Sequence, residues 1–172
     1  GFTIGTGGEL NGNSQGIVAW CWKANGSGSA NSDGALSSSV SANTAGGFSI
    51  VTFTGNGSGT TVGHGLSKAP ELIITKGRNF TDAWHTQVYP AIVATKTLLL
   101  NTTGAQTTSN AFNDTAPTTS VFSVGDSQPT NSGHGNDYIA YCFDSITGYS
   151  KFGTFEGSGS TQTITTGFRP AM

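Results

Sequence analysis

The chain has 172 residues, enough for one β domain with further segments beside it, and Gly, Ser, Thr and Asn together account for 84 of them. Charged residues make up only 9% and the formal net charge is -2, so seven Lys and Arg cannot form the basic footprint of a nucleic-acid or membrane-surface binder. The 34% hydrophobic and 10% aromatic content excludes a highly charged, aromatic-poor disordered chain, and no apolar run is long enough to span a bilayer.

Alternating and aromatic runs bounded by Gly and Asn predict an all-β chain, because no window shows a capped pattern of helical period. The turn spacing, roughly 8–12 residues, favours an antiparallel β-sandwich or jelly roll. In chain order, we expect strands near residues 16–23, 48–54, 60–64, 71–77, 84–89, 96–101, 120–125, 137–144, 149–155 and 162–166.

An internal repeat is present, since four segments return in the same order with matched apolar, aromatic and glycine positions. They are FTIG at 2–5 with FSVG at 122–125, IVAWCW at 17–22 with YIAYCF at 138–143, FSIVTFTGNGS at 48–58 with YSKFGTFEGSGS at 149–160, and TTVGHGLSKAP at 60–70 with TQTITTGFRP at 161–170. Chance similarity between Gly- and Thr-rich stretches is the alternative, but the matched aromatic positions argue against it.

The repeat is interrupted by the small, polar residues 25–46, which are typical of a linker or long loop. We therefore predict the end of a preceding β module at 1–24, a linker at 25–46, a complete β-sandwich module at 47–146 and the start of a following module at 147–172. Because the chain reads as starting in mid-strand at Gly1 and stopping in the same way at Met172, we expect it to be part of a longer polypeptide.

The runs AWCW and AYCF alternate between two apolar faces, which predicts a central strand that is covered on both sides. We expect Trp20, Trp22, Tyr141 and Phe143 to be packed. The two cysteines, Cys21 and Cys142, occupy equivalent places in successive modules. Buried free thiols are therefore favoured over a mutual disulfide.

The three histidines carry little sign of metal chemistry. His64 and His134 each lie between two glycines, and no histidine or cysteine pair has metal-ligand spacing, so loop positions are favoured over metal ligands. His85 lies beside Trp84 and could help to bind a sugar, although packing at a sheet edge is the favoured alternative. We take Trp84, His85 and Tyr89 as a possible glycan contact and expect no cofactor.

The sequence offers no catalytic motif. Its nine carboxylates are scattered and no GxSxG elbow is present, so we expect no enzymatic activity.

Three stretches carry a family resemblance: FSIVTFTGNGSGTTVGHGLSKAPELIITK, LLLNTTGAQTTSNAFNDTAPTTSVFSVG and YIAYCFDSITGYSKFGTFEGSGS with TGFRPA after it. They resemble a repeat family of bacteriophage virion proteins, and look most like the repeats in tail-fibre or appendage proteins of marine and cyanobacterial phages. The resemblance implies β-sandwich modules in tandem within a structural, adhesive part of a virion. The insertion at 25–46 departs from the compact junction YCFDSITGYSKFG.

We therefore expect a structural virion protein, a segment of a tail fibre or of a capsid or tail appendage, that associates with itself and mediates attachment to a host. The alternative is a lectin-like extracellular module that binds carbohydrate. Expected partners are further copies of the chain, with a trimer by analogy to phage fibres, other virion proteins and a host-surface glycan. Neither nucleic acid binding nor membrane insertion is expected, and the location is the virion or the extracellular space. Scarce charge at open sheet edges also favours a homo-oligomer.

Overall fold

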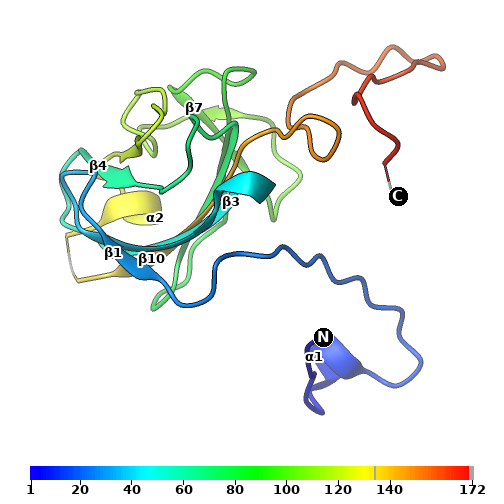
Figure 1. Cartoon of the computed structure of the whole chain (residues 1–172), viewed down its shortest axis with the longest axis horizontal. Coiled ribbons are helices and arrows are strands. Elements are labelled where there is room, and N and C mark those ends of the chain that lie inside the picture. Colours follow the sequence, from blue (N-terminus) through cyan, green and yellow to red (C-terminus); the bar gives the residue numbers. More distant parts are fainter. Residues whose placement is uncertain (134, 171–172) are drawn as a thin grey trace.

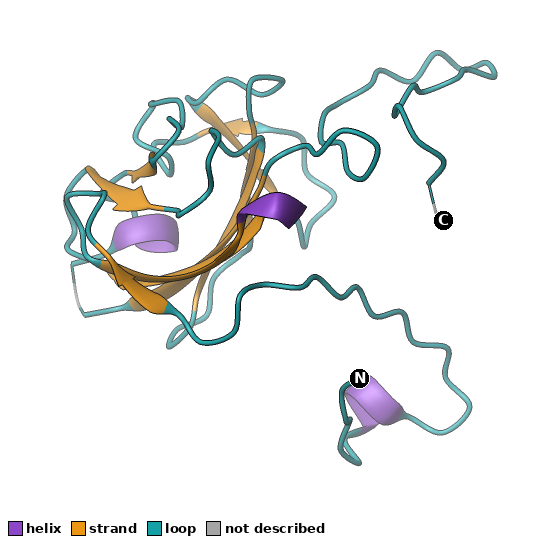
Figure 2. Ribbon diagram, viewed as in Figure 1, coloured by secondary structure: helices purple, strands orange, loops and turns teal. Residues whose placement is uncertain are grey.

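The computed structural model describes residues 1–133 and 135–170, and its regular structure is almost entirely β (Figures 1 and 2). Ten strands are present among the described residues, with only single helical turns beside them: α1 (Gly8–Asn11), η1 (Thr44–Gly46) and α2 (Gln128–Asn131). The all-β prediction is confirmed.

Eight antiparallel strands form one curved sheet (Figure 2). Its order is β1-β2-β3-β10-β5-β6-β7-β8. The strands are β1 (Ser29–Asn31), β2 (Ser38–Asn43), β3 (Phe48–Thr54), β5 (Leu72–Gly77), β6 (His85–Val88), β7 (Lys96–Leu99), β8 (Thr107–Thr108) and β10 (Asp137–Phe143).

A second sheet of two strands, β4 (Thr60–Gly63) and β9 (Val121–Val124), completes a sandwich-like arrangement. Side chains from both sheets meet in one apolar cluster, to which Val62, Phe122 and Val124 contribute from the small sheet. The large sheet contributes alternate residues of β3 and β10 to this cluster, because successive side chains of a strand point to opposite faces of the sheet. These residues are Val51, Phe53, Tyr138, Ala140 and Cys142.

Seven of the expected strands are confirmed, and three are wrong. Residues 16–23, 149–155 and 162–166 contain no strand. Their alternating patterns resemble those of β3, β4 and β10, but no neighbouring strand of the chain pairs with them. A strand is defined by hydrogen bonds to a neighbour, so the pattern alone does not produce one.

The expected linker at 25–46 is also corrected, since it contains β1 and β2. β2 pairs with β3 over six residues, from Ser38 opposite Phe53 to Asn43 opposite Phe48. The serines of this segment also bond elsewhere: the Ser41 hydroxyl donates to the Gly26 carbonyl at 2.8 Å. The folded unit, here called the body, therefore comprises residues 25–146 rather than 47–146.

Two extended segments leave the body, and we call them the N-terminal arm (residues 1–24) and the C-terminal arm (residues 147–170). Both lie on the same side of the body in Figure 1, one below the other, and they run in different directions. The packing expected for Trp20 and Trp22 is wrong, since these side chains are 67% and 50% exposed. Cys21, expected to be buried, is exposed as well. Phe143 is buried and Tyr141 half-buried.

The large sheet ends in very short strands, β1 at one edge and β8 at the other. Short edge strands limit pairing with other chains. The expectation that open edges with little charge would drive self-association therefore gains no support from the sheet edges. In the part of the chain that the structure describes, no helix has the length and apolarity that a membrane crossing requires.

Candidate functional site

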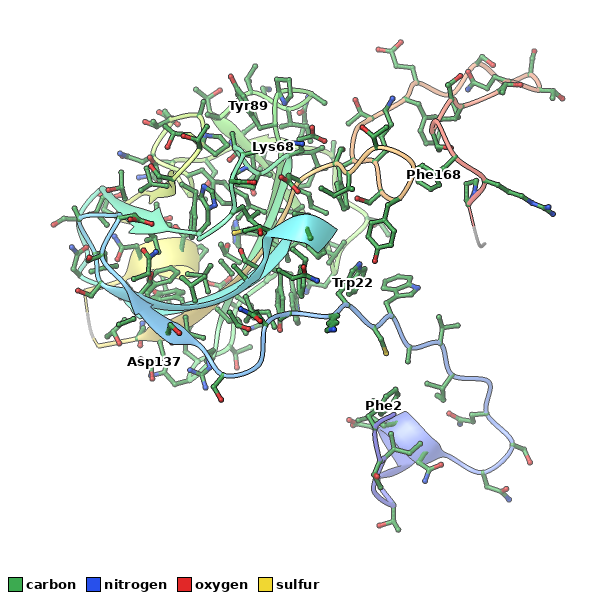
Figure 3. All side chains as sticks on the ribbon, in the orientation of Figure 1. Phe2, Trp22, Lys68, Tyr89, Asp137 and Phe168 are labelled. Carbon is green, nitrogen blue, oxygen red and sulfur yellow. The ribbon has the colours of Figure 1, made fainter. Side chains whose placement is uncertain are left out.

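The three residues predicted to contact a glycan do not meet in one site. Trp84 precedes β6 and stacks on Tyr141 of β10, although β5 lies between these two strands, whereas His85 is buried. Tyr89, labelled in Figure 3, follows the other end of β6 and lines a separate groove. Successive strand residues point to opposite faces of a sheet, which explains why Trp84 and His85 separate.

Trp84 and Tyr141 form a half-buried aromatic pair, with ring centroids 6.3 Å apart and planes 18° apart. Tyr141 lies opposite Ile50 of β3 and Ile74 of β5, and both of these side chains are also half-buried. The Trp84 backbone N–H donates to the Asn101 side-chain oxygen at 3.0 Å, which fixes the chain at the base of the ring. An apolar face with a stacked aromatic pair is suited to bind the apolar face of a sugar ring or another flat surface.

His85 is a packing residue rather than an exposed ligand group. Its Nε2 lies 4.0 Å from Asp82 Oδ1, the one contact at ion-pair distance among the described residues, and it is an ion pair only when the ring is protonated. Burial lowers the pKa of His85, and the nearby Asp82 carboxylate opposes that shift. The packing expected for this side chain therefore occurs inside the sheet and not at its edge, because β6 pairs with β5 on one side and with β7 on the other.

Tyr89 lines an open groove of about 510 Å³ between the body and the C-terminal arm. Glu71 and Lys151 supply opposite charges to its wall, and Phe152 supplies an aromatic ring. The Ser145 hydroxyl donates to the Glu71 carboxylate across the groove. The volume falls within the range of small-ligand sites, about 300–1,000 Å³, but part of the wall belongs to the arm.

A buried carboxylate, Asp144, follows β10 directly. Burial raises the pKa of Asp144, with Lys68 opposing the shift and Glu71 adding to it. One of its oxygens, Oδ1, has no hydrogen-bond partner among the described residues. No group of three or more potential metal ligands occurs in that part of the chain, so this carboxylate stands without the neighbours that a metal centre needs.

His64 is held by hydrogen bonds on both ring nitrogens. The Leu66 N–H donates to Nδ1 at 3.1 Å, so Nε2 carries the proton and donates to the Thr118 carbonyl, also at 3.1 Å. Burial lowers the pKa of His64, which keeps the ring neutral. Its role is to connect the chain after β4 to the loop before β9. His134, the other histidine between glycines, lies outside the described residues.

The two cysteines are free and differ in environment. Cys142 is fully buried, and burial raises the pKa of its thiol to about 12, which makes the thiolate scarce. Cys21 lies exposed on the N-terminal arm.

The comparison with known proteins gives one match. A family model described as a domain of unknown function, DUF7483, matches residues 1–172. The chain belongs to the DUF7483 family. Neither the curated proteins nor the solved structures contain a match to it. Because the match covers the arms as well as the body, the DUF7483 pattern includes all three segments.

Two features of this DUF7483 chain were missed from the sequence. Tyr141 was expected to be packed inside, but it forms half of the Trp84 pair; the alternation in AYCF contained the signal, because it places Tyr141 and Cys142 on opposite faces. The groove beside Tyr89 carries no sequence signal, since residues from Glu71 to Gly167 come together there only through folding.

Proposed function

We propose that the chain is a structural segment of a phage virion, part of a tail fibre or of a capsid or tail appendage that associates with itself and contributes to host attachment. The observation that carries this proposal is the repetition of one β unit along the chain, which is typical of extended, serially built proteins. The resemblance to phage tail-fibre repeats supplies the virion context.

The C-terminal arm repeats the backbone turns of the body as well as its sequence. Gly47, Gly57 and Gly65 of the body have positive φ, at 62°, 73° and 69° respectively. Their sequence counterparts in the arm do too: Gly148 at 77°, Gly159 at 70° and Gly167 at 85°. Left-handed glycines at matched positions are a conformational repeat, which similarity of composition alone does not produce.

The N-terminal arm repeats local structure in the same way. α1 lies 120 residues before α2, the same offset that relates FTIG to FSVG. Ser14 has a φ of 62°, and Gly135, 121 residues later, has a φ of 68°. Both arms therefore carry the turns of the body's own unit, which supports an assembly of repeated units in tandem.

The composition of the body suits a particle component. Its core is apolar, its one cysteine, Cys142, is free, and one His–Asp contact lies at ion-pair distance among the described residues. Its packing therefore depends mainly on buried apolar area. In this proposal the chain performs no chemistry; its role is to extend and to present surfaces.

Electron microscopy of virions tests the proposal. An antiserum raised against the chain should label purified particles of the phage whose genome encodes it, on a tail or capsid appendage. Labelling that is absent from intact particles but present in the infected-cell lysate would exclude the virion assignment.

A second candidate, a lectin-like module, is favoured by the half-buried Trp84–Tyr141 pair. Stacking on a sugar ring should be lost in Trp84→Ala and largely kept in Trp84→Phe. A glycan array, read with both variants and with the exposed Leu100→Ala as a control, distinguishes a sugar platform from a packing surface.

A further inference from the structure

The exposed apolar side chains of the molecule are concentrated on the arms. Of the twelve large hydrophobic residues that are exposed in the described part of the chain, only Val93 and Leu100 belong to the body. The other ten lie on the arms, and Figure 3 shows two of these regions at Phe2 and Trp22. They are Phe2, Ile4, Leu10, Ile17, Val18, Trp20, Trp22, Tyr149, Phe155 and Ile164. Such a concentration marks an interaction surface.

Eight apolar arm residues have sequence counterparts that are buried in the body. In the N-terminal arm, Phe2 matches Phe122, Ile4 matches Val124, Ile17 matches Tyr138 and Trp22 matches Phe143. In the C-terminal arm, Tyr149 matches Phe48, Phe155 matches Phe53, Ile164 matches Val62 and Phe168 matches Leu66. The arms therefore carry residues of the type that forms the core of the body, but in the arms these residues are not packed into a core.

The two arms are complementary halves of one unit. The N-terminal arm corresponds to β9, α2 and β10, and the C-terminal arm corresponds to β3 and β4. In the body, β3 pairs with β10 and β4 pairs with β9. These four strands, with Leu66 just after β4, supply nine of the thirteen residues of the core cluster. Each arm thus contains the pairing partners that the other lacks.

We propose that the N-terminal arm of one copy of the chain pairs with the C-terminal arm of a second copy, so that the two arms form a four-stranded unit around a shared apolar core. This inference rests on the self-association in the proposed function, and it names the segments and their register. The two arms run apart from each other (Figure 1), and their apolar side chains are exposed. Because each arm carries counterparts of the strands that pair with those of the other in the body, a second copy supplies a matching partner for both arms.

The two arms leave the body close together, and this position allows every arm in an assembly to pair with another arm. The Trp22 and Phe152 rings both contact Phe143, with centroid separations of 5.4 Å and 5.2 Å, so both arms leave the body at the same end. Copies that face each other at this end can exchange arms in a closed ring, which satisfies all of the arms without open-ended growth.

The body fixes the expected register. β10 and β3 run antiparallel, with Phe143 opposite Phe48 and Cys142 opposite Ser49. The repeat transfers these pairs to Trp22 opposite Tyr149 and Cys21 opposite Ser150. Directly opposed residues of antiparallel strands lie at Cα distances that a disulfide can bridge.

A cross-linking experiment on the full chain tests the register. The variant Ser150→Cys is incubated with oxidised glutathione, which accepts the two electrons as two thiols lose their protons and form a disulfide. We expect a disulfide between chains, seen as covalent oligomers on a non-reducing gel. Cys142 does not compete, because it is buried. The control Ser158→Cys, in the turn at the arm's tip, should form far fewer oligomers.

A disulfide that closes within one chain would show that the arms pair intramolecularly, and equal oligomer yields from Ser150→Cys and Ser158→Cys would show that no register exists. Either result overturns the proposal.

A second measurement does not depend on cysteine geometry. Sedimentation of the full chain with Phe155→Asp should show self-association weakened about tenfold or more, because the charge would enter the shared core. Val93→Asp, at an exposed apolar position on the body, should leave association unchanged. Equal effects of the two variants would overturn arm pairing. Because virion labelling is a separate readout, that failure leaves the proposed function standing.

Discussion

The ring of Tyr138 stacks on the ring of Phe53, with centroids 5.3 Å apart and planes 16° apart, near one end of the β10–β3 pair. The Tyr138 hydroxyl also accepts the Ser132 N–H and donates to the Gln128 carbonyl, each at 2.7 Å. One side chain therefore holds the core and the α2 turn together.

Removing that hydroxyl should destabilise the body. In Tyr138→Phe the buried Ser132 N–H loses its acceptor, so we expect the free energy of unfolding to fall by about 1–3 kcal/mol in urea denaturation. Tyr141→Phe, on the half-buried outer face of the same strand, serves as the control and should change it by less than about 0.5 kcal/mol. Equal losses would mean that the hydroxyl contacts to α2 contribute nothing specific.

The repeat offers a matched test of core packing. Phe122→Ala removes a buried ring from β9 and should cost about 3–5 kcal/mol of unfolding free energy. Its counterpart in the N-terminal arm, Phe2, is exposed, so Phe2→Ala should leave the unfolding of the body unchanged when measured on dilute protein. A large loss from Phe2→Ala under those conditions would contradict the exposed position of the arm.

Stability should fall on mild acidification because of His64. Its pKa is lowered in the folded state, so its contribution is complete above the unfolded value, 6.5, and is lost as the pH falls below it. Protonation would also place an N–H on Nδ1 against the Leu66 N–H. Urea denaturation at a series of pH values should show the decrease.

The variant His64→Gln should reduce this dependence in the range that begins near pH 6.5 and extends down to the lowered pKa of the folded state. His85, whose pKa is lowered in the same direction, makes His85→Gln the matched second variant. Asp144 acts in the opposite sense, because its raised pKa favours the folded state on acidification; Asp144→Asn removes that term. An unchanged slope in His64→Gln would refute the assignment.

The two thiols should differ sharply in accessibility. In dilute native protein, Cys21 should react promptly with a maleimide, since it is exposed on the arm. Cys142 should react only as the body unfolds, because it is buried and its pKa is raised to about 12. Mass spectrometry of a labelling time course measures both, and simultaneous labelling would contradict the buried position. If arms of different copies pair, Cys21 should become slower at high protein concentration.

The sequence predicted the strands whose partners lie within the body. The runs FSIVTFT (β3) and DYIAYCF (β10) alternate clearly between two faces, and the two strands pair with each other. The same patterns in residues 16–23 and 149–155 gave wrong strand predictions. The hydrophobic period indicates which side chains are suited to burial, but it does not indicate whether a strand is present to pair with the segment. β2 was missed for the opposite reason: its serines and alanines carry little hydrophobic signal, and pairing with β3 makes it a strand.

The candidate site was less predictable than the fold. Trp84 was identified from its residue type, but its partner Tyr141 lies 57 positions away and is brought beside it by pairing of β10 with β5. His85 was associated with Trp84 because the two are adjacent in sequence, yet adjacency within a strand separates side chains to opposite faces. Burial of Asp144 depends on the whole fold and has no local signature.

The near-absence of ion pairs has a consequence for the environments in which the body can persist. With a single His–Asp contact among the described residues, dissolved salt has almost nothing to screen. The unfolding free energy should therefore be nearly the same in fresh water and in brine, apart from a slight gain from ions that strengthen apolar burial. We therefore expect the body to keep its stability when it passes between solutions of low and high salt concentration.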